Sequence, residues 1–177
     1  SARVFTGGGV GGFVRFRHGP SGQEAAVPLE TRIAASYVLP FDNTNGSATG
    51  IAVANLTAAP EGVPVIIRDS FGTQVETGTV SLPAGGHTTF NLSDRFASSG
   101  GIDGTVEFAT PADGRIGVMG MNFPSSGGFT AIPVAAGPGL NSGSAAHLAV
   151  GQGWTSTIQL INSSNAPTQA RIRFFDD

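Results

Sequence analysis

The chain contains no cysteine, few charged residues and no long hydrophobic run. Without cysteine there is neither a disulfide framework nor a thiolate metal site. A net charge of −3 supplies no basic field, which argues against nucleic acid as a partner. No apolar segment approaches the roughly 20 residues of a transmembrane helix, so no membrane span is expected. Only 12% of the residues are charged, and so low a share predicts an extracellular or bacterial cell-surface protein.

Alternation of apolar and polar residues with a period of two dominates the sequence, and helical periodicity is almost absent. Val63 to Ile67, Val106 to Phe108 and Ala170 to Phe174 each place apolar side chains on one face. Turn signals such as Asn45-Gly46 separate these runs. Short strands between frequent turns predict an all-β protein made of immunoglobulin-like β-sandwich modules.

The sequence also repeats itself out of phase. Gly46 to Asp69 aligns without gaps onto Gly153 to Asp176, an offset of 107 residues. Gly9 to Leu29 aligns onto Gly114 to Val134, an offset of 105 residues. The front of one unit therefore reappears at the C-terminus, and the back of a unit opens the N-terminus. The identities in the first alignment include Gly46/Gly153, Ile51/Ile158, Asn55/Asn162, Ala59/Ala166 and Pro60/Pro167.

This phase shift predicts one complete module flanked by two half-modules. Residues 1–30 form the C-terminal half of a module, residues 36–135 a complete module, and residues 147–177 the N-terminal half of another. Residues 136–146 form a linker by their Gly, Pro and Ser content. Ser70 to Thr105 has no counterpart at either end. Either the matching residues belong to a longer natural chain, or the split module is trimmed.

Several segments resemble a repeat module of large secreted bacterial surface proteins. The resemblance implies secretion and a tandem array of β-modules, and it carries over no catalytic residue. In the complete module it rests on Phe41–Gly46, Gly50–Asn55, Leu82–His87 and Gly104–Phe108. In the C-terminal half it rests on Gly151–Thr155 and Phe174–Asp177.

No motif predicts chemistry, so neither an enzyme nor a cofactor or metal is expected. The glycines of Gly7–Gly12 match a dinucleotide-binding spacing, but strand-like alternation follows where that motif needs a helix. Asp42–Gly46 offers oxygen ligands, yet its spacing does not fit an EF-hand calcium loop and Asn-Gly favours a tight turn. The three histidines have no metal-ligand spacing: His18, His87 and His147.

The leading interpretation is a non-enzymatic structural protein, a building block of a surface assembly or filament. Its modules would be joined by strand completion, with Val14, Phe16, Ile172 and Phe174 forming the assembly interface. If the two halves come from successive chains, the product is a head-to-tail homopolymer. If they come from one chain, the product is a compact two-module monomer.

The alternative is a cell-surface adhesion or carbohydrate-binding module with polysaccharide as its partner. Sugar platforms favour tryptophan and tyrosine, whose rings combine apolar area with a polar tip. This chain offers only Trp154 and Tyr37. The aromatic inventory therefore favours the structural interpretation over the binding one.

Overall fold

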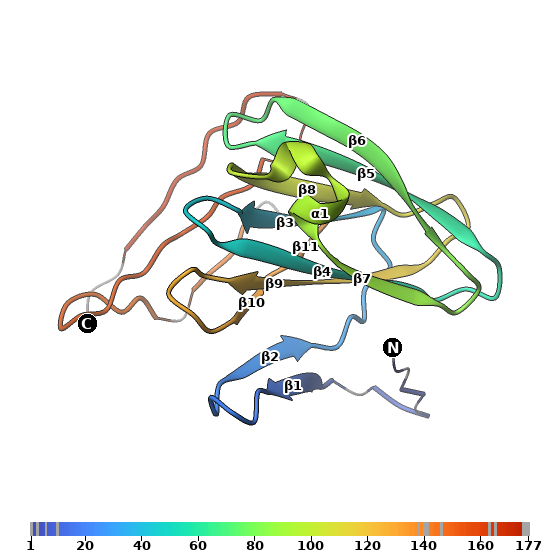
Figure 1. The fold of residues 1–177 in the computed structure, drawn as a ribbon, viewed down its shortest axis with the longest axis horizontal. Coiled ribbons are helices and arrows are strands. Elements are labelled where there is room, and N and C mark those ends of the chain that lie inside the picture. The colour runs from blue at the N-terminus through green and yellow to red at the C-terminus, as the bar shows by residue number, and fades with distance from the viewer. Residues whose placement is uncertain are drawn as a thin grey trace. The chain divides into compact units, whose positions relative to one another are not determined.

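The computed structural model describes the chain except residues 1, 3, 6, 10, 138, 140, 141, 146, 163, 165 and 175–177. The proposed match of Asp176 with Asp69 lies outside the described residues. The chain divides into two compact units, Ser1–Gly137 and Pro138–Asp177, and the ribbon of Figure 1 follows both. Each unit is described by itself.

The first unit is built almost entirely of strands, as the alternation predicts. One short helix, α1 (Leu92–Arg95), and one 3-10 turn, η1 (Ala97–Ser99), interrupt them. The strands are β1 (Phe13–Arg17), β2 (Glu24–Pro28), β3 (Ser36–Asp42), β4 (Ala48–Asn55), β5 (Glu61–Asp69), β6 (Gln74–Leu82), β7 (His87–Asn91), β8 (Asp103–Ala109), β9 (Ile116–Phe123), β10 (Thr130–Ile132) and β11 (Ala135–Gly137).

All strand pairs are antiparallel and form three sheets. One sheet has the order β10-β9-β4-β7, and a second has the order β11-β3-β8-β5-β6. The third is the two-stranded hairpin β1-β2. Consecutive strands β3 and β4, and again β8 and β9, lie in different sheets (Figure 1). The predicted all-β class is confirmed, and the arrangement is sandwich-like.

One hydrophobic core is shared by the two larger sheets. Alternate residues of each strand enter it, because successive side chains of a strand point to opposite faces. Val63, Val65 and Ile67 of β5 are buried, as are Val106 and Phe108 of β8, in the positions that the alternation predicts.

The module extends slightly further along the chain than expected. Residues 135–137 form β11, which pairs with the N-terminal end of β3. The linker predicted for residues 136–146 therefore begins two residues too early. Alanine and glycine have weak strand propensity, and pairing along the edge of β3 overrides it here.

The N-terminal hairpin resembles the β9–β10 hairpin, with a difference in register. Val14 of β1 lies opposite Val27 of β2, and Gly120 of β9 lies opposite Ile132 of β10. The two registers require offsets that differ by one residue: if β2 aligns with β10 at 105 residues, β1 aligns with β9 at 106. The uniform offset of 105 expected from sequence therefore cannot hold for both strands. A one-residue slip matters because it exchanges the two faces of a strand.

Candidate assembly site

The large apolar side chains that remain exposed are concentrated outside the module. Among the described residues of 36–135, only Phe71, Val75 and Phe123 belong to this class. Each large side chain left in water forgoes roughly 1.5 to 3 kcal/mol of burial free energy, so these segments are the strongest candidates for contact with a partner. The remaining exposed residues are Val4, Phe5, Phe13, Val14, Ile33, Val150, Trp154, Ile158, Leu160, Ile172 and Phe174.

Strand β1 presents a free edge. It pairs only with β2, so its other edge has no strand partner in the described part of the chain. Val14 is 44% exposed and Phe16 is half-buried, and both lie on the same face of the strand. An unpaired edge next to exposed apolar side chains is a ready template for another strand.

The C-terminal unit contains a turn with the geometry of one in the module. In the module, Asn45 and Gly46 both have positive φ, 51° and 78°. Gln152 and Gly153, which align with them, have φ values of 49° and 87°. Ser47 donates a backbone hydrogen bond to Thr44 across the first turn, and Trp154 donates the matching one to Gly151.

A second turn also matches, and it is built on an asparagine. The Asn55 side chain donates to the Ala59 carbonyl at 2.7 Å and accepts from the Thr57 backbone at 2.8 Å. Asn162 donates to the Ala166 carbonyl at 2.8 Å and accepts from the Ser164 backbone at 3.0 Å. The hydroxyl groups of Thr57 and Ser164 complete both turns with the same pair of bonds.

Between these two turns the segments differ. In the module β4 fills the interval, with hydrogen-bonded neighbours on both edges, β7 and β9. The aligned residues 155–162 form no strand, and Ile158 and Leu160 are 42% and 63% exposed where Ile51 and Val53 are buried. The repeat predicts equal secondary structure and equal burial in the two segments, and this prediction is wrong for the strands. Within the part of the chain that the structure describes, the counterpart segment pairs with no strand.

The bonds of Asn55 also show which partner the C-terminal segment lacks. The Asn55 amide donates a second hydrogen bond, at 3.0 Å, to the Pro83 carbonyl in the β6–β7 turn. Pro83 belongs to the stretch that has no counterpart at the chain ends. The Asn162 amide donates to the Ala166 carbonyl, and the residue is exposed.

The four predicted interface residues fall into two pairs. Val14 and Phe16 share one face of β1. Ile172 and Phe174 lie in the second unit, outside any strand, and are 48% and 70% exposed. Their burial in one common core remains a prediction.

The arginines beside this face are held by one acid. Arg15 and Arg17 alternate with the apolar residues of β1, and both lie within 3.7 Å of the Glu24 carboxylate on β2. Glu24 is thus shared by both arginines and offsets one of their two positive charges. Such exposed ion pairs contribute little stability.

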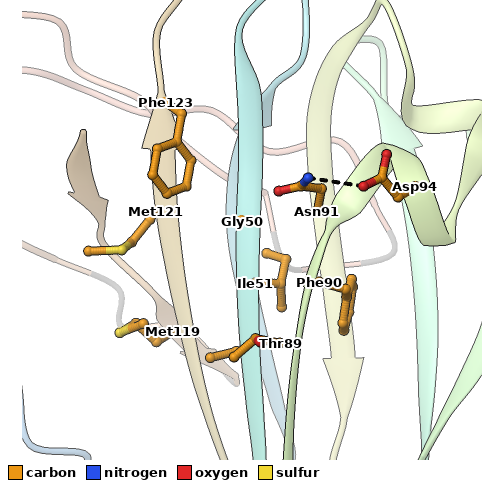
Figure 2. Close-up of a pocket in the computed structure, with 10 residues that line it drawn as sticks. Gly50, Ile51, Thr89, Phe90, Asn91, Asp94, Met119, Met121 and Phe123 are labelled. Atoms are coloured by element: carbon orange, nitrogen blue, oxygen red, sulfur yellow. Dashed lines mark hydrogen bonds between the residues drawn. The ribbon is translucent and has the colours of Figure 1, made fainter. Parts of the chain in front are cut away.

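A groove lies on the outer face of the β10-β9-β4-β7 sheet. Figure 2 shows Met119, Met121 and Phe123 along β9, with Gly50 on β4 beside them. The groove holds about 470 Å³. A side chain at Gly50 would come within 2.9 Å of the Phe123 ring, so the ring lies across this glycine.

Two polar side chains that line the groove are hydrogen-bonded to each other. Asn91 Nδ2 donates a 3.0 Å hydrogen bond to Asp94 Oδ2, as Figure 2 shows. The carboxylate therefore has a partner at the rim, and the lining offers no second acid or base for proton transfer. Its chemistry suits contact with apolar groups.

A charged cluster fastens the segment before β3. Glu30 accepts hydrogen bonds from Arg32 Nε at 2.9 Å and Nη2 at 2.6 Å, and the Tyr37 hydroxyl donates to the Arg32 carbonyl at 3.1 Å. Burial would raise the pKa of Glu30, but the Arg32 hydrogen bonds and charge lower it below the ordinary value. Burial raises the pKa of Tyr37. The cluster is structural, since each group is satisfied by its neighbour.

The motifs weighed in the sequence have local structural roles. Asp42 Oδ1 accepts from the Thr44 backbone at 2.8 Å and from its hydroxyl at 2.6 Å, so the Asp42–Gly46 turn uses its own carboxylate. His18 Nδ1 lies 2.7 Å from the Ser21 hydroxyl in the β1–β2 turn. The glycines of Gly7–Gly12 precede a strand rather than a helix.

Comparisons with known proteins do not assign a function. No protein-family model matches this chain, and no curated protein or solved structure matches it either. Within the described residues, no helix has both the length and the apolar character needed to cross a membrane. A function for this chain is therefore inferred from its two terminal segments, residues 1–30 and 147–177.

Proposed function

We propose that the chain is a non-enzymatic structural protein of the extracellular space or bacterial cell surface. It acts as a building block of a surface assembly or filament, and successive copies are joined by strand completion. The observation that carries this proposal is that two preformed turns flank residues 155–162, a segment that is exposed, matches β4 in sequence and forms no strand. Because both ends of this segment are already fixed by turns, it can form a strand when a neighbouring strand pairs with it.

The free edge of β1 is the strand edge that residues 155–162 could pair with. It belongs to the back half of a module, and residues 155–162 belong to the front half. A contact between the back of one copy and the front of the next is heterologous and does not close, so it builds a chain of copies. The low charge of the sequence favours such close contact between identical subunits.

We also propose that the module is a variant of the immunoglobulin arrangement. In both, the second strand pairs with the fifth and the third with the sixth, which here are β4 with β7 and β5 with β8. Relative to that arrangement the first and seventh strands, β3 and β9, have exchanged sheets, and the fourth strand, β6, lies beside β5 instead of β7. The exchange makes β9, from the back of the module, the neighbour of β4, from its front.

The proposal is tested by size in solution as a function of concentration. Wild-type protein should form larger particles as its concentration rises, measured by light scattering or sedimentation. Phe174→Asp should abolish this growth, because a charge cannot enter an apolar contact. The Ser36 to Ala135 module should remain folded in that variant.

The matched control is Phe71→Asp. Phe71 is 92% exposed in the β5–β6 turn of the complete module, so it offers a phenylalanine of equal size outside the proposed contact. Growth that persists in Phe174→Asp, or that is lost equally in Phe71→Asp, would show that strand completion is not the joining contact.

Adhesion through carbohydrate is the second candidate, and one side chain favours it. Trp154 is 68% exposed at the end of the Gly151–Trp154 turn, beside a hollow that His147 and Val150 also line. Tyr37, the other ring considered for sugar contact, is 1% exposed and hydrogen-bonded to Arg32. Binding to a glycan array that is lost in Trp154→Ala, with particle growth unchanged, would favour this function.

A further inference from the structure

The contact that joins the front and back of the complete module is the pairing of β4 with β9. It runs antiparallel from Ala48 opposite Phe123 to Asn55 opposite Ile116. Ile51 lies opposite Gly120, and the inward residues of β4 are buried at this seam. A split module needs the same seam, because its two halves are the parts that β4 and β9 represent.

The counterpart of β4 is residues 155–162, in the alignment that both turns support. Ile158 then stands for Ile51, and Leu160 for Val53. The inward face of the segment reads Ser156, Ile158, Leu160, where β4 has Thr49, Ile51, Val53. Polar and apolar positions agree along this row.

The counterpart of β9 is β1, and we align the two at 106 residues, which keeps β2 on β10 at the sequence offset of 105. Val14 then stands for Gly120, whose position faces the core. This alignment turns Val14 and Phe16 inward and Arg15 outward. The offset expected from sequence would instead turn Arg15 inward, where an unpaired charge is costly.

We propose that β1 of one copy pairs antiparallel with residues 155–162 of a second copy, with Val14 opposite Ile158. In this register Gly12 lies opposite Leu160 and Phe16 opposite Ser156. This inference rests on the proposed function and specifies which residues of the two strands lie opposite each other. On the outer face, Arg15 and Arg17 meet Thr157 and Thr155, so the register places no like charge opposite the arginines.

A second copy is the occupant because, in the filament proposed above, the back of one copy meets the front of the next. Val14 and Ile158 are 44% and 42% exposed, so each segment offers apolar area to a partner. The preformed turns reduce the ordering that residues 155–162 need on docking, and preorganisation of this kind favours association.

The register also limits what Ile172 and Phe174 can do. Their counterparts, Val65 and Ile67, lie on β5, which pairs with β6 and β8. β6 lies wholly within the stretch without a counterpart, and β8 begins in it. Ile172 and Phe174 therefore join the assembly through its core, while hydrogen bonding between copies runs along β1.

The absence of cysteine makes the register directly testable. Residues opposite each other in antiparallel strands have Cα atoms about 4.5 to 5.5 Å apart, within the range for a disulfide. Val14→Cys and Ile158→Cys proteins are mixed under mild oxidation at a concentration where wild type assembles. A disulfide-linked pair containing one of each variant is expected on non-reducing gels.

The matched control mixes Val14→Cys with Gln159→Cys. This pair is one residue out of register, and position 159 points to the opposite face. It should give no mixed disulfide. Equal cross-linking of both mixtures would overturn the register.

Three further outcomes separate this inference from the function beneath it. Assembly without the Val14–Ile158 cross-link overturns the register and leaves strand completion standing. A concentration-independent disulfide within the double variant Val14→Cys/Ile158→Cys assigns the pairing to one chain and overturns the second-copy occupant. Absence of both assembly and cross-link contradicts the proposed function itself.

Discussion

Residues 46–69 and 153–174 have similar sequences and identical turns, yet only the first segment forms strands. Gln152 and Gly153 adopt the backbone of Asn45 and Gly46, and the Asn162 turn repeats the bonds that Asn55 makes with Thr57 and Ala59. The comparison separates two kinds of information. Turns are specified by residues near one another in sequence, whereas a strand requires a neighbour that its own sequence does not contain.

The largest expected difference between the regions concerns the two asparagines. Asn55→Ala should lower the free energy of unfolding by about 3 kcal/mol, because several buried groups lose their partners at roughly 1 to 3 kcal/mol each. Asn162→Ala should change it by less than about 0.5 kcal/mol, since the residue is exposed. Urea unfolding of both variants measures the contrast. Equal losses would mean that residues 153–174 already belong to a folded module in solution.

A smaller difference is expected at the paired glycines. Gly46→Ala should destabilise the module by about 1 to 2 kcal/mol, because alanine is disfavoured at positive φ. Gly153→Ala should leave thermal unfolding of the module unchanged and weaken assembly, since its turn matters only when a second copy docks. Loss of melting temperature in Gly153→Ala without loss of assembly would contradict this division.

The smallest expected effect tests the first unit alone and depends on pH. The lowered pKa of Glu30 means that its carboxylate is favoured by folding. This contribution is complete above the ordinary pKa of glutamate and is lost as the pH falls through the lowered one. Thermal unfolding of Glu30→Gln should therefore depend less on pH in the acid range than wild type does. Parallel pH profiles would show that the Glu30–Arg32 pair adds no stability.

The core strands can be predicted from the sequence, because the residues that alternate as apolar are the ones that are buried. Val63, Val65 and Ile67 all occupy the predicted face. The same alternation at residues 170–174 predicts a strand that the chain does not form, since β6, which pairs with β5 in the module, has no counterpart among the described residues. β11 shows the opposite error, because Ala135–Gly137 has no strand signature and pairs only through the edge of β3.

The candidate site was predictable in part for the same reason. Val14 and Phe16 were identified from alternation, and β1 places them on one face. The proposed register of β1 with residues 155–162 could not be predicted from the sequence. The ungapped alignment of the N-terminal hairpin with the β9–β10 hairpin differs by one residue from the alignment that their pairing registers require. Only the observed pairing of Val14 with Val27 and of Gly120 with Ile132 reveals the shift.

The pairing of β11 with β3 has a mechanical consequence. The chain enters the module at Ser36 and leaves it at Gly137, and these residues lie opposite each other. A pulling force along an array therefore acts on adjacent ends of one antiparallel pair, which opens by peeling rather than by shear. β11 is held to β3 by three residue pairs, whereas β3 is held to β8 by seven. In the proposed filament, we therefore expect load to release β11 before the strands of the core separate.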